Sequence, residues 1–244
     1  MQEGFRGLPR EDEVGRPVMN VKVVQLLECD PDLAEGLTSE ENDRACRSLA
    51  VQKVELKKGA WGPNLGTDKA GHIGYLVCTG LLVRRVQVGK GSSVELLGHG
   101  DLLRPWQEDI SSFCTSSWEV LQAAEVLHLG PQVATMLRDF PAVFANLVGR
   151  GLRRSRALAA DAAVSSIVGL DGRLLILLWQ LAERWGTTTE DGVRLEVHLP
   201  HRVLAELTGS RRPSVTTALT LLQESNRLAT ADDGTWLLVG QSPI

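Results

Sequence analysis

The hydrophobic positions in the first half of the chain form short runs separated by glycines. Gly59, Gly80 and the stretch Gly89-Lys90-Gly91 interrupt these runs at a spacing typical of turns between strands. Apolar runs of about four to eight residues, bounded in this way, are typical of β-strands. A compact antiparallel barrel or roll is therefore predicted. Its expected strands are Val51–Leu56, Ile73–Cys78, Leu81–Val88, Val94–Leu97, Trp118–Leu121 and Glu125–Leu129.

The segment before these strands, residues 21–50, has a helical pattern. Val21–Glu28 is a short apolar stretch that is broken at Asp30-Pro31, and Ser39 then precedes two acidic residues. A serine at the N-cap and acids in the first turn both stabilise the start of a helix. We therefore expect two helical pieces here, the second capped by Ser39.

From about residue 131 the apolar positions recur at steps of three and four residues, which is the helical period. Pro131–Leu137 is predicted as a short helix, and Pro141 is suited to the first turn of the next one. That helix should extend for about six turns, roughly 30 Å at 1.5 Å per residue. Its apolar stripe comprises Phe144, Leu147, Val148, Gly151, Leu152, Ser155, Leu158, Ala159 and Ala162.

The stripe needs a surface to cover it. One candidate is the roll of the same chain, and the other is the same helix of a second chain, as in a two-stranded coiled coil. The length of the helix and the small residues in the stripe favour the homodimer.

The C-terminal part predicts a helix-turn-helix followed by a hairpin. After a helix at Arg173–Trp185, ended by Gly186, and a strand at Val193–Leu199, Pro200 opens a short helix. Thr208-Gly209-Ser210 is the tight turn, and we expect Ser210 to cap the second helix. The aspartate–glycine step after Asp232 predicts a β-hairpin between Leu228 and Val239, in the position of a wing.

The outward face of the second helix has a composition suited to DNA. All its residues are hydrogen-bond donors and none is acidic, although the whole chain has a net charge of −4. Hydroxyls and helix N-terminal amides bind phosphate, and an arginine can bind guanine in the major groove. The predicted DNA-binding residues are Ser210, Arg211, Arg212, Ser214, Thr216, Thr217 and Thr220.

Composition narrows the possible classes of protein. The 244 residues are 43% hydrophobic, but no apolar run approaches the roughly 20 residues that span a bilayer. The N-terminal stretch has no apolar centre, so we interpret it as a mobile arm rather than a signal and expect a cytoplasmic protein. The four cysteines form no C-x-x-C pair, so we expect neither a bound metal nor a cofactor.

Enzyme motifs are absent as well. The chain has no G-x-S-x-G motif, no phosphate-cradling glycine loop and no histidine pair of the kind used by cupin metal sites. We therefore do not expect an enzyme.

The order of these elements resembles the superfamily of the cyclic-AMP receptor protein and the fumarate–nitrate reductase regulator, which are bacterial transcription factors. The resemblance covers about Val21 to Val239. Its most specific part is VLAELTGSRRPSVTTALTLLQESNRL, which resembles the family's DNA-contacting motif. Weaker likenesses are LLECDPDLAEGLTSEE, VELLGHGDLLRPW and KKGAWGPNLGTDKAGHIGYLVCTGLLVRR, with the family's glycines at Gly59, Gly66 and Gly80.

The resemblance implies an α+β fold: an antiparallel, cyclic-nucleotide-binding-like jelly roll, a long dimerisation helix and a winged helix-turn-helix. It also implies a homodimeric regulator that binds double-stranded promoter DNA and RNA polymerase, with a roll that senses an unidentified effector or none. The expected parts are an arm at 1–20, a sensor roll at 21–138, the dimer helix at 139–166 and a DNA-binding domain at 167–244.

Two departures from the family pattern limit what can be carried over. Arg104-Pro105 stands where the cyclic-nucleotide binders have glycine–glutamate, and no arginine or lysine lies between Gln107 and Met136. A buried phosphate without a cation is costly, so we do not expect cyclic AMP binding. The alternative is a cyclic nucleotide or related anion bound in a different pose, and its pocket would be formed by Leu103, Arg104 and Trp106.

The second departure is in the recognition helix. The resemblance places Arg212 at the family's guanine-contacting position, but Pro213 and Thr217 replace a glutamate and a second arginine. The operator must therefore differ from the family's consensus.

Overall fold

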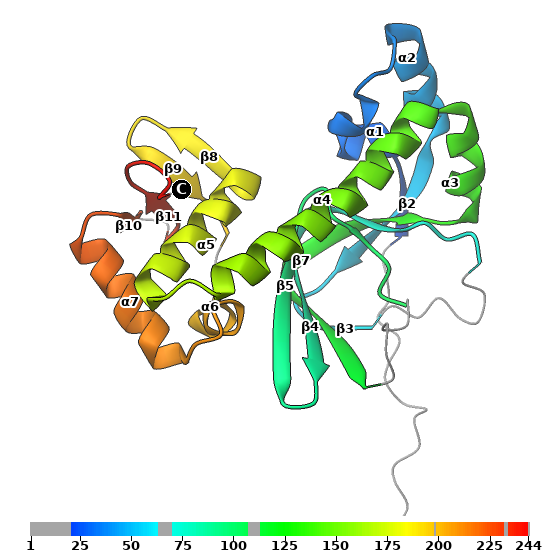
Figure 1. Cartoon of the computed structure of the whole chain (residues 1–244). Coiled ribbons are helices and arrows are strands. Elements are labelled where there is room, and N and C mark those ends of the chain that lie inside the picture. Colours follow the sequence, from blue (N-terminus) through cyan, green and yellow to red (C-terminus); the bar gives the residue numbers. More distant parts are fainter. Residues whose placement is uncertain (1–20, 63–69, 107–112, 198, 232–233, 244) are drawn as a thin grey trace, which may run out of the picture.

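The computed structural model describes residues 21–62, 70–106, 113–197, 199–231 and 234–243 (Figure 1). One long helix connects a β-rich N-terminal part, which lies alongside it, to a mainly helical C-terminal part. The expected α+β fold, with an antiparallel roll, a long helix and a C-terminal helix-turn-helix, is confirmed. The expected arm at residues 1–20, Gly66, and the hairpin turn at Asp232–Asp233 lie outside the described residues.

The roll is one antiparallel sheet. Its strand order is β1-β2-β7-β4-β5, with β3 paired to β7 and β6 paired to β4. Every strand pair in this sheet is antiparallel. The strands are β1 Val21–Gln25, β2 Ala50–Leu56, β3 Gly59–Trp61, β4 Gly74–Val88, β5 Gly91–Leu97, β6 Leu102–Leu103 and β7 Cys114–Leu129.

Two of the long strands were each expected as two short ones. Gly80, expected as a turn, lies inside β4, where the register with β7 shifts on both sides of it. Its φ is +86°, and a Cβ at this position would lie 2.4 Å from the carbonyl oxygen of Ala123. Gly80 therefore forms a β-bulge, in which glycine permits both the bend and the close approach of β7. The hairpin at Gly89-Lys90-Gly91 is confirmed between β4 and β5.

The N-terminal segment differs from its predicted helix. Residues 21–25 form β1, which pairs with β2, and the first helix is only one turn long. β-Branched valines dominate this strand, and an open edge of β2 was available to pair with them. The cap of α2 is Thr38 rather than Ser39, because Thr38 and Glu41 form a reciprocal capping box.

The helices around the roll enclose an apolar core together with residues of the sheet. Leu26, Leu127 and Leu147 are among the residues buried in it. The helices are α1 Leu26–Cys29, η1 Pro31–Ala34, α2 Ser39–Ser48, α3 Pro131–Met136, η2 Leu137–Asp139 and the long α4 Pro141–Ser165.

The C-terminal part is a small α+β unit with a four-stranded sheet of order β10-β11-β9-β8. Gly186–Thr189, expected only to end a helix, is the first strand of this sheet, and the next strand ends at Leu195 rather than Leu199. The elements are α5 Leu170–Trp185, β8 Gly186–Thr189, β9 Gly192–Leu195, α6 His201–Leu207, α7 Arg212–Glu224, β10 Leu228–Thr230 and β11 Trp236–Leu238.

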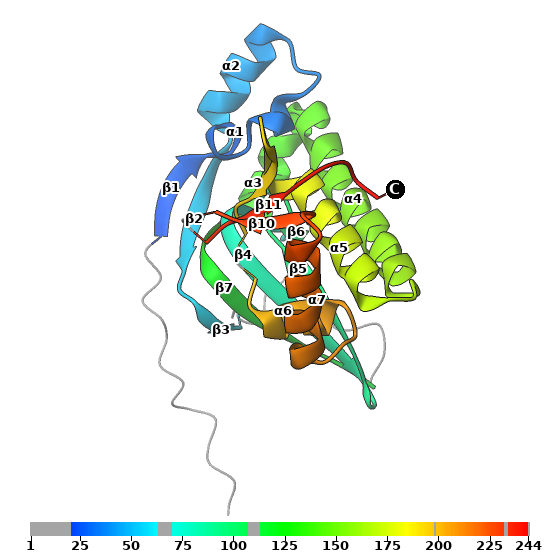
Figure 2. The same cartoon turned by 90° about the vertical axis from the view of Figure 1, so that its left-hand side faces the viewer.

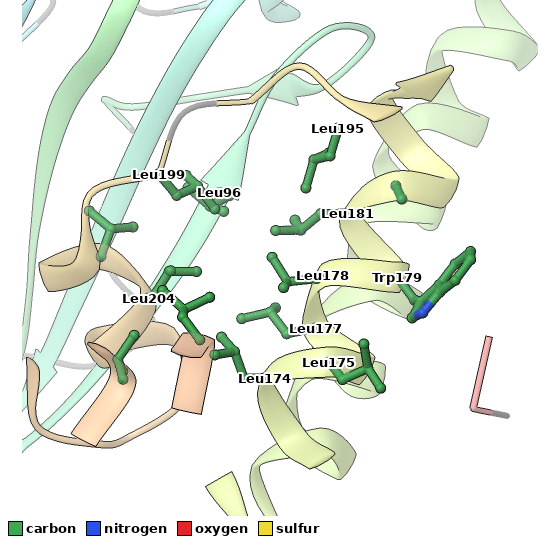
Figure 3. Close-up of a cluster of buried hydrophobic side chains, with 14 of the residues drawn as sticks. Leu96, Leu174, Leu175, Leu177, Leu178, Trp179, Leu181, Leu195, Leu199 and Leu204 are labelled. Carbon is green, nitrogen blue, oxygen red and sulfur yellow. The ribbon is translucent and has the colours of Figure 1, made fainter. Parts of the chain in front are cut away.

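The core of the C-terminal part continues into the roll. Leu96 of β5 is buried with Leu178 and Leu181 of α5 and with Leu204 of α6 (Figure 3). In Figure 2, which looks onto the C-terminal part, α6 and α7 lie in front of β4 and β5. The two parts of the chain are therefore packed together through apolar side chains.

Candidate nucleic-acid interface

The turn between α6 and α7 is fixed by backbone hydrogen bonds. The amide of Thr208 donates to the carbonyl of Leu204 at 3.0 Å, and the amide of Ser210 donates to the carbonyl of Ala205 at 2.8 Å. Gly209 has a φ of +60°, a left-handed conformation that glycine adopts at little cost. This geometry ends α6 and sets the direction in which α7 begins.

Ser210 does not cap α7. The N-cap residue is Arg211, in an extended conformation, and no side chain caps the helix. The Ser210 hydroxyl instead accepts from Arg173 Nη2 of α5 at 3.2 Å and donates to the carbonyl of Thr208 at 3.2 Å. It ties the turn to α5, and the first-turn amides of α7 lack a capping side chain. Uncapped amides of this kind can bind a phosphate.

One face of α7 is buried and the opposite face is exposed, as the sequence predicts. Val215, Ala218, Leu219 and Leu222 are buried. The exposed face carries Arg211, Arg212, Ser214, Thr216, Thr217 and Thr220, whereas Ser210 is half-buried in the turn.

Both arginines of this face are available to a partner. In the part of the chain that the structure describes, neither the Arg211 nor the Arg212 guanidinium has a hydrogen bond or an ion pair. On the neighbouring helix α6, Arg202 and Glu206 form an ion pair with each other at 3.0 Å. A charge-assisted bond to an external acceptor is therefore open to both α7 arginines.

The threonines of α7 do not present free donors, which corrects the expectation that the whole face consists of donors. Thr216, Thr217 and Thr220 each place the hydroxyl 3.2–3.3 Å from the carbonyl four residues earlier. A hydroxyl that donates within its own helix offers only its lone pairs and methyl group outward. The Thr216 hydroxyl also lies 2.9 Å from Nδ1 of His201. The donors directed outward are therefore the two arginines and Ser214.

The C-terminal hairpin is joined to α7. β10 and β11 pair as an antiparallel hairpin, which confirms the expected element, and β11 continues the sheet through β9. Gln223 Nε2 of α7 donates to Thr230 Oγ1 at 3.0 Å.

The three residues predicted for an effector pocket have other contacts. Leu103 is fully buried in the roll core, and Trp106 packs at its edge. The Trp106 ring makes an edge contact with Tyr75 at 5.5 Å between ring centroids. Arg104 is exposed, and its Nη2 donates to the carbonyl of His72 at 3.3 Å. The assignment of these residues to an effector pocket stays a prediction.

The predicted dimer stripe is exposed except at one position. Phe144, Val148, Leu152 and Leu158 are 49%, 46%, 56% and 39% exposed, respectively. Leu147 is only 1% exposed, because it lies at the edge of the stripe and is buried in the core between α4 and the roll. The smaller members Gly151, Ser155 and Ala159 are exposed with the large ones.

Sequence reasoning missed the ion pairs that fix α4 to the roll. Arg150 pairs with Asp30, and Arg154 pairs with Glu95 of β5 through Nη2 and Oε2, 2.7 Å apart. The arginines are visible in the sequence, but their acidic partners lie 120 and 59 residues away. Only the folded structure reveals these pairs.

Known proteins match this chain at two levels: a family model matches the C-terminal domain, and solved structures match most of the chain. Residues 172–238 match the family model of the Crp-like helix-turn-helix domain. The C-terminal domain is a Crp-like helix-turn-helix domain. A global nitrogen regulator of Synechocystis sp. is 32% identical over 100 residues, which are 40% of this chain and 44% of that protein. The chain therefore matches less than half the length of this relative.

Solved structures share the fold over most of the chain. A CooA variant from Carboxydothermus hydrogenoformans is 18% identical with a TM-score of 0.58, over 88% of this chain and 91% of that one. A CRP-family transcriptional regulator from Thermus thermophilus is 22% identical with a TM-score of 0.54, over 76% and 91%. These two structures, at 18% and 22% identity, show that the chain shares their fold. The Synechocystis and Thermus thermophilus proteins are regulators.

Two further findings concern the described residues only. None of their helices is both long and apolar enough to cross a lipid bilayer. They also contain no group of three or more histidine, cysteine, aspartate or glutamate side chains placed to hold a metal ion.

Proposed function

We propose that this chain is a homodimeric, sequence-specific DNA-binding transcriptional regulator in which α7 enters the major groove of promoter DNA. The observation that carries the proposal is the exposed face of α7 from Arg211 to Thr220, which has two unpaired arginines, no acidic residue and a buried opposite face. A helix in the second position of a helix-turn-helix contacts base edges with its N-terminal residues. Arg212 and Ser214 belong to that first turn, and Arg211 is the N-cap residue just before it.

The side chains of α7 take different roles in this proposal. Arg212 binds the O6 and N7 atoms of a guanine, for which its forked donor geometry is suited. Arg211, Ser214 and the uncapped amides contact phosphates, which position the helix but carry no sequence information. The methyl groups of Thr216, Thr217 and Thr220 contact apolar base edges such as the thymine methyl, while Ser210 supports the turn.

The homodimer forms through the exposed stripe of α4. An apolar row along six turns of helix is costly to leave in water, and the same row on a second chain would cover it. A two-fold dimer would present one α7 to each half of a symmetric operator. We place the protein in the cytoplasm with RNA polymerase as a partner, since it acts on promoters.

The roll has the form of an effector-sensing domain, and we propose that it does not bind cyclic AMP. Arg104 is exposed, and its guanidinium already donates to the carbonyl of His72. Arg104-Pro105 also replaces the glycine–glutamate pair of the family's cyclic-nucleotide binders. The alternative, a cyclic nucleotide or related anion held near Arg104 in another pose, requires that side chain to leave the His72 carbonyl. Titration calorimetry with cyclic AMP distinguishes the two.

The test of the proposed function is selection of bound fragments from random duplex DNA by the full-length protein. We expect an enriched two-fold symmetric site. Arg212→Ala should weaken binding to that site by about 1–3 kcal/mol and remove the preference at one base pair per half-site. Arg138→Ala, an exposed arginine far from α7, is the matched control and should bind as the parent does. Equal affinity of the parent for all sequences would refute the proposal.

A further inference from the structure

A cavity of about 310 Å³ lies where the roll, the long helix and the C-terminal domain meet. Its walls come from α4 and α5, and it is completed by Leu96 of β5, Asp101 of the following loop and Leu207 at the end of α6. This volume is at the lower end of the range for small-molecule sites, about 300–1,000 Å³. The cavity is separate from the residues predicted for an effector pocket, none of which lines it.

The cavity and the centre of the exposed stripe lie on different sides of α4. At about 100° per residue, Arg153 and Ala160 project away from Phe144 and Val148. Arg156 follows Leu152 by four residues and so adjoins the edge of the stripe.

Part of the cavity wall is apolar. Leu96, Leu177 and Leu181 line it and are each only 5% exposed, and Leu207 and Ala157 extend the same surface. These side chains come from several elements, so the apolar wall crosses the junction between the roll and the C-terminal domain. It suits the non-polar body of a small molecule.

Four arginines and three acidic residues also line the cavity, and two of the arginines are already neutralised. Arg184 Nη2 lies 2.6 Å from Asp101 Oδ2, and Arg154 binds Glu95 with both nitrogens of its fork. Arg153 and Arg156 remain, and in the described ranges neither has an ion pair or a side-chain hydrogen bond. They are the cations of this cavity that remain available to a ligand.

The other polar groups of the cavity can accept hydrogen bonds. Gln180 Oε1 is buried and has no hydrogen-bond donor among the described residues. Burial raises the pKa of Asp161, although the charge of Arg184 opposes the rise, so this carboxyl is protonated more readily than usual. Glu183 lines the cavity too but is exposed to solvent. A buried acceptor without a donor is costly, and a ligand N–H or O–H group would remove that cost.

We propose that this cavity binds a small amphipathic organic anion. Its apolar body lies against Leu96, Leu177 and Leu181, its anionic group binds Arg153 and Arg156, and an N–H or O–H group donates to Gln180. Because the walls come from the roll, α4 and the C-terminal domain, the bound anion bridges all three. Any resulting change in DNA affinity rests on the proposed function, so the test measures binding of the anion directly.

The probe is 8-anilinonaphthalene-1-sulfonate, an aromatic anion with an N–H group whose fluorescence rises in apolar surroundings. It is titrated into the full-length chain without DNA. We expect saturable binding of one probe per chain, and binding weakened about tenfold or more in Arg153→Gln/Arg156→Gln, since charge-assisted bonds are lost. The matched control is Arg47→Gln/Arg138→Gln, which removes the same charge from exposed arginines elsewhere and should bind as the parent does.

A second pair of variants separates the cavity from the exposed stripe. Ala160→Trp fills the cavity from an exposed helical position and should abolish binding, while circular dichroism and thermal unfolding verify that it folds. Phe144→Glu alters the stripe about three helical turns before Arg156 and should leave the affinity unchanged. Binding that survives both Ala160→Trp and Arg153→Gln/Arg156→Gln, or that Phe144→Glu abolishes, would overturn the proposal. These results do not depend on whether the protein binds DNA.

Discussion

Arg150 of the long helix places its Nη2 2.7 Å from Oδ1 and 2.9 Å from Oδ2 of Asp30. Asp30 is fully buried and Arg150 is 5% exposed. Gly100, with a φ of +77°, adjoins the pair, and a Cβ there would lie 2.9 Å from Arg150 Nη1. The pair thus joins the short N-terminal helices, a loop of the roll and α4 at one point.

Arg150→Met should destabilise the protein strongly. The substitution leaves the buried carboxylate of Asp30 without its cation, which costs about 3–5 kcal/mol in the free energy of unfolding. Urea unfolding measures this loss. Asp30→Leu/Arg150→Met removes both charges and should recover most of it.

The control for Arg150→Met is Lys22→Met, which breaks the exposed pair of Lys22 and Glu55, 3.2 Å apart. Because water screens that pair, its loss should cost less than about 1 kcal/mol. If Arg150→Met cost no more than Lys22→Met, the Arg150–Asp30 pair would not be a major stabilising contact.

A second prediction concerns the ion pairs between the roll and α6. Arg85 of β4 lies 2.9 Å from Glu206 of α6, and Arg202 of α6 lies 3.2 Å from Glu119 of β7. A double-mutant cycle of Arg85→Gln and Glu206→Gln should give a coupling energy of about 0.5–1 kcal/mol that decreases in about 1 M NaCl, because these side chains are partly exposed. Additive effects would mean that α6 does not dock on the roll in solution.

Much of the fold follows from local sequence patterns. The helix at 141–165, the hairpin at Gly89-Lys90-Gly91 and the two faces of α7 depend on periodicity and turn residues, which are local properties. The incorrect predictions concern residues whose structure depends on contacts with distant parts of the chain. Residues 21–25 became a strand because β2 offers them an open edge, and Gly80 became a bulge because β7 continues past it.

Some features of the candidate site could likewise be predicted from the local sequence, and others could not. The exposed face of α7 could be predicted because its inner residues identify the opposite side. That Ser210 binds Arg173 rather than capping α7, and that Leu147 faces the roll, depend on which surface packs beside each residue. The cavity at the domain junction needs three elements brought together, and no stretch of sequence encodes it locally.

A third prediction compares two leucines of α4, one exposed and one buried. Leu152 is 56% exposed and Leu147 is 1% exposed. Leu152→Glu should convert a dimer to a folded monomer, detected by sedimentation velocity. Leu147→Ala should keep the dimer but lower the free energy of unfolding by about 2–5 kcal/mol, because it opens a cavity in the core. A dimer that Leu152→Glu leaves unchanged would place the interface elsewhere.

The last prediction concerns two histidines of the roll. His72 Nδ1 and His128 Nε2 lie 2.9 Å apart, and their rings stack with centroids separated by 5.0 Å. At this distance the two nitrogens can share one proton in a hydrogen bond, but they cannot both carry a proton directed at each other. Burial lowers the pKa of His128, and the neighbouring charge of His72 lowers it further.

The lowered pKa has a definite consequence for stability. Between the folded pKa of His128 and the unfolded value of about 6.5, the unfolded chain binds more protons, so stability falls as the pH decreases through this window. We expect the parent to lose roughly 1 kcal/mol or less between about pH 7.5 and 5.5 from this source, since water partly screens the half-buried ring. Urea unfolding of the parent and of His128→Gln at both pH values measures it. The loss should be smaller in His128→Gln, and an equal loss in both proteins would show that the histidine pair does not control acid stability.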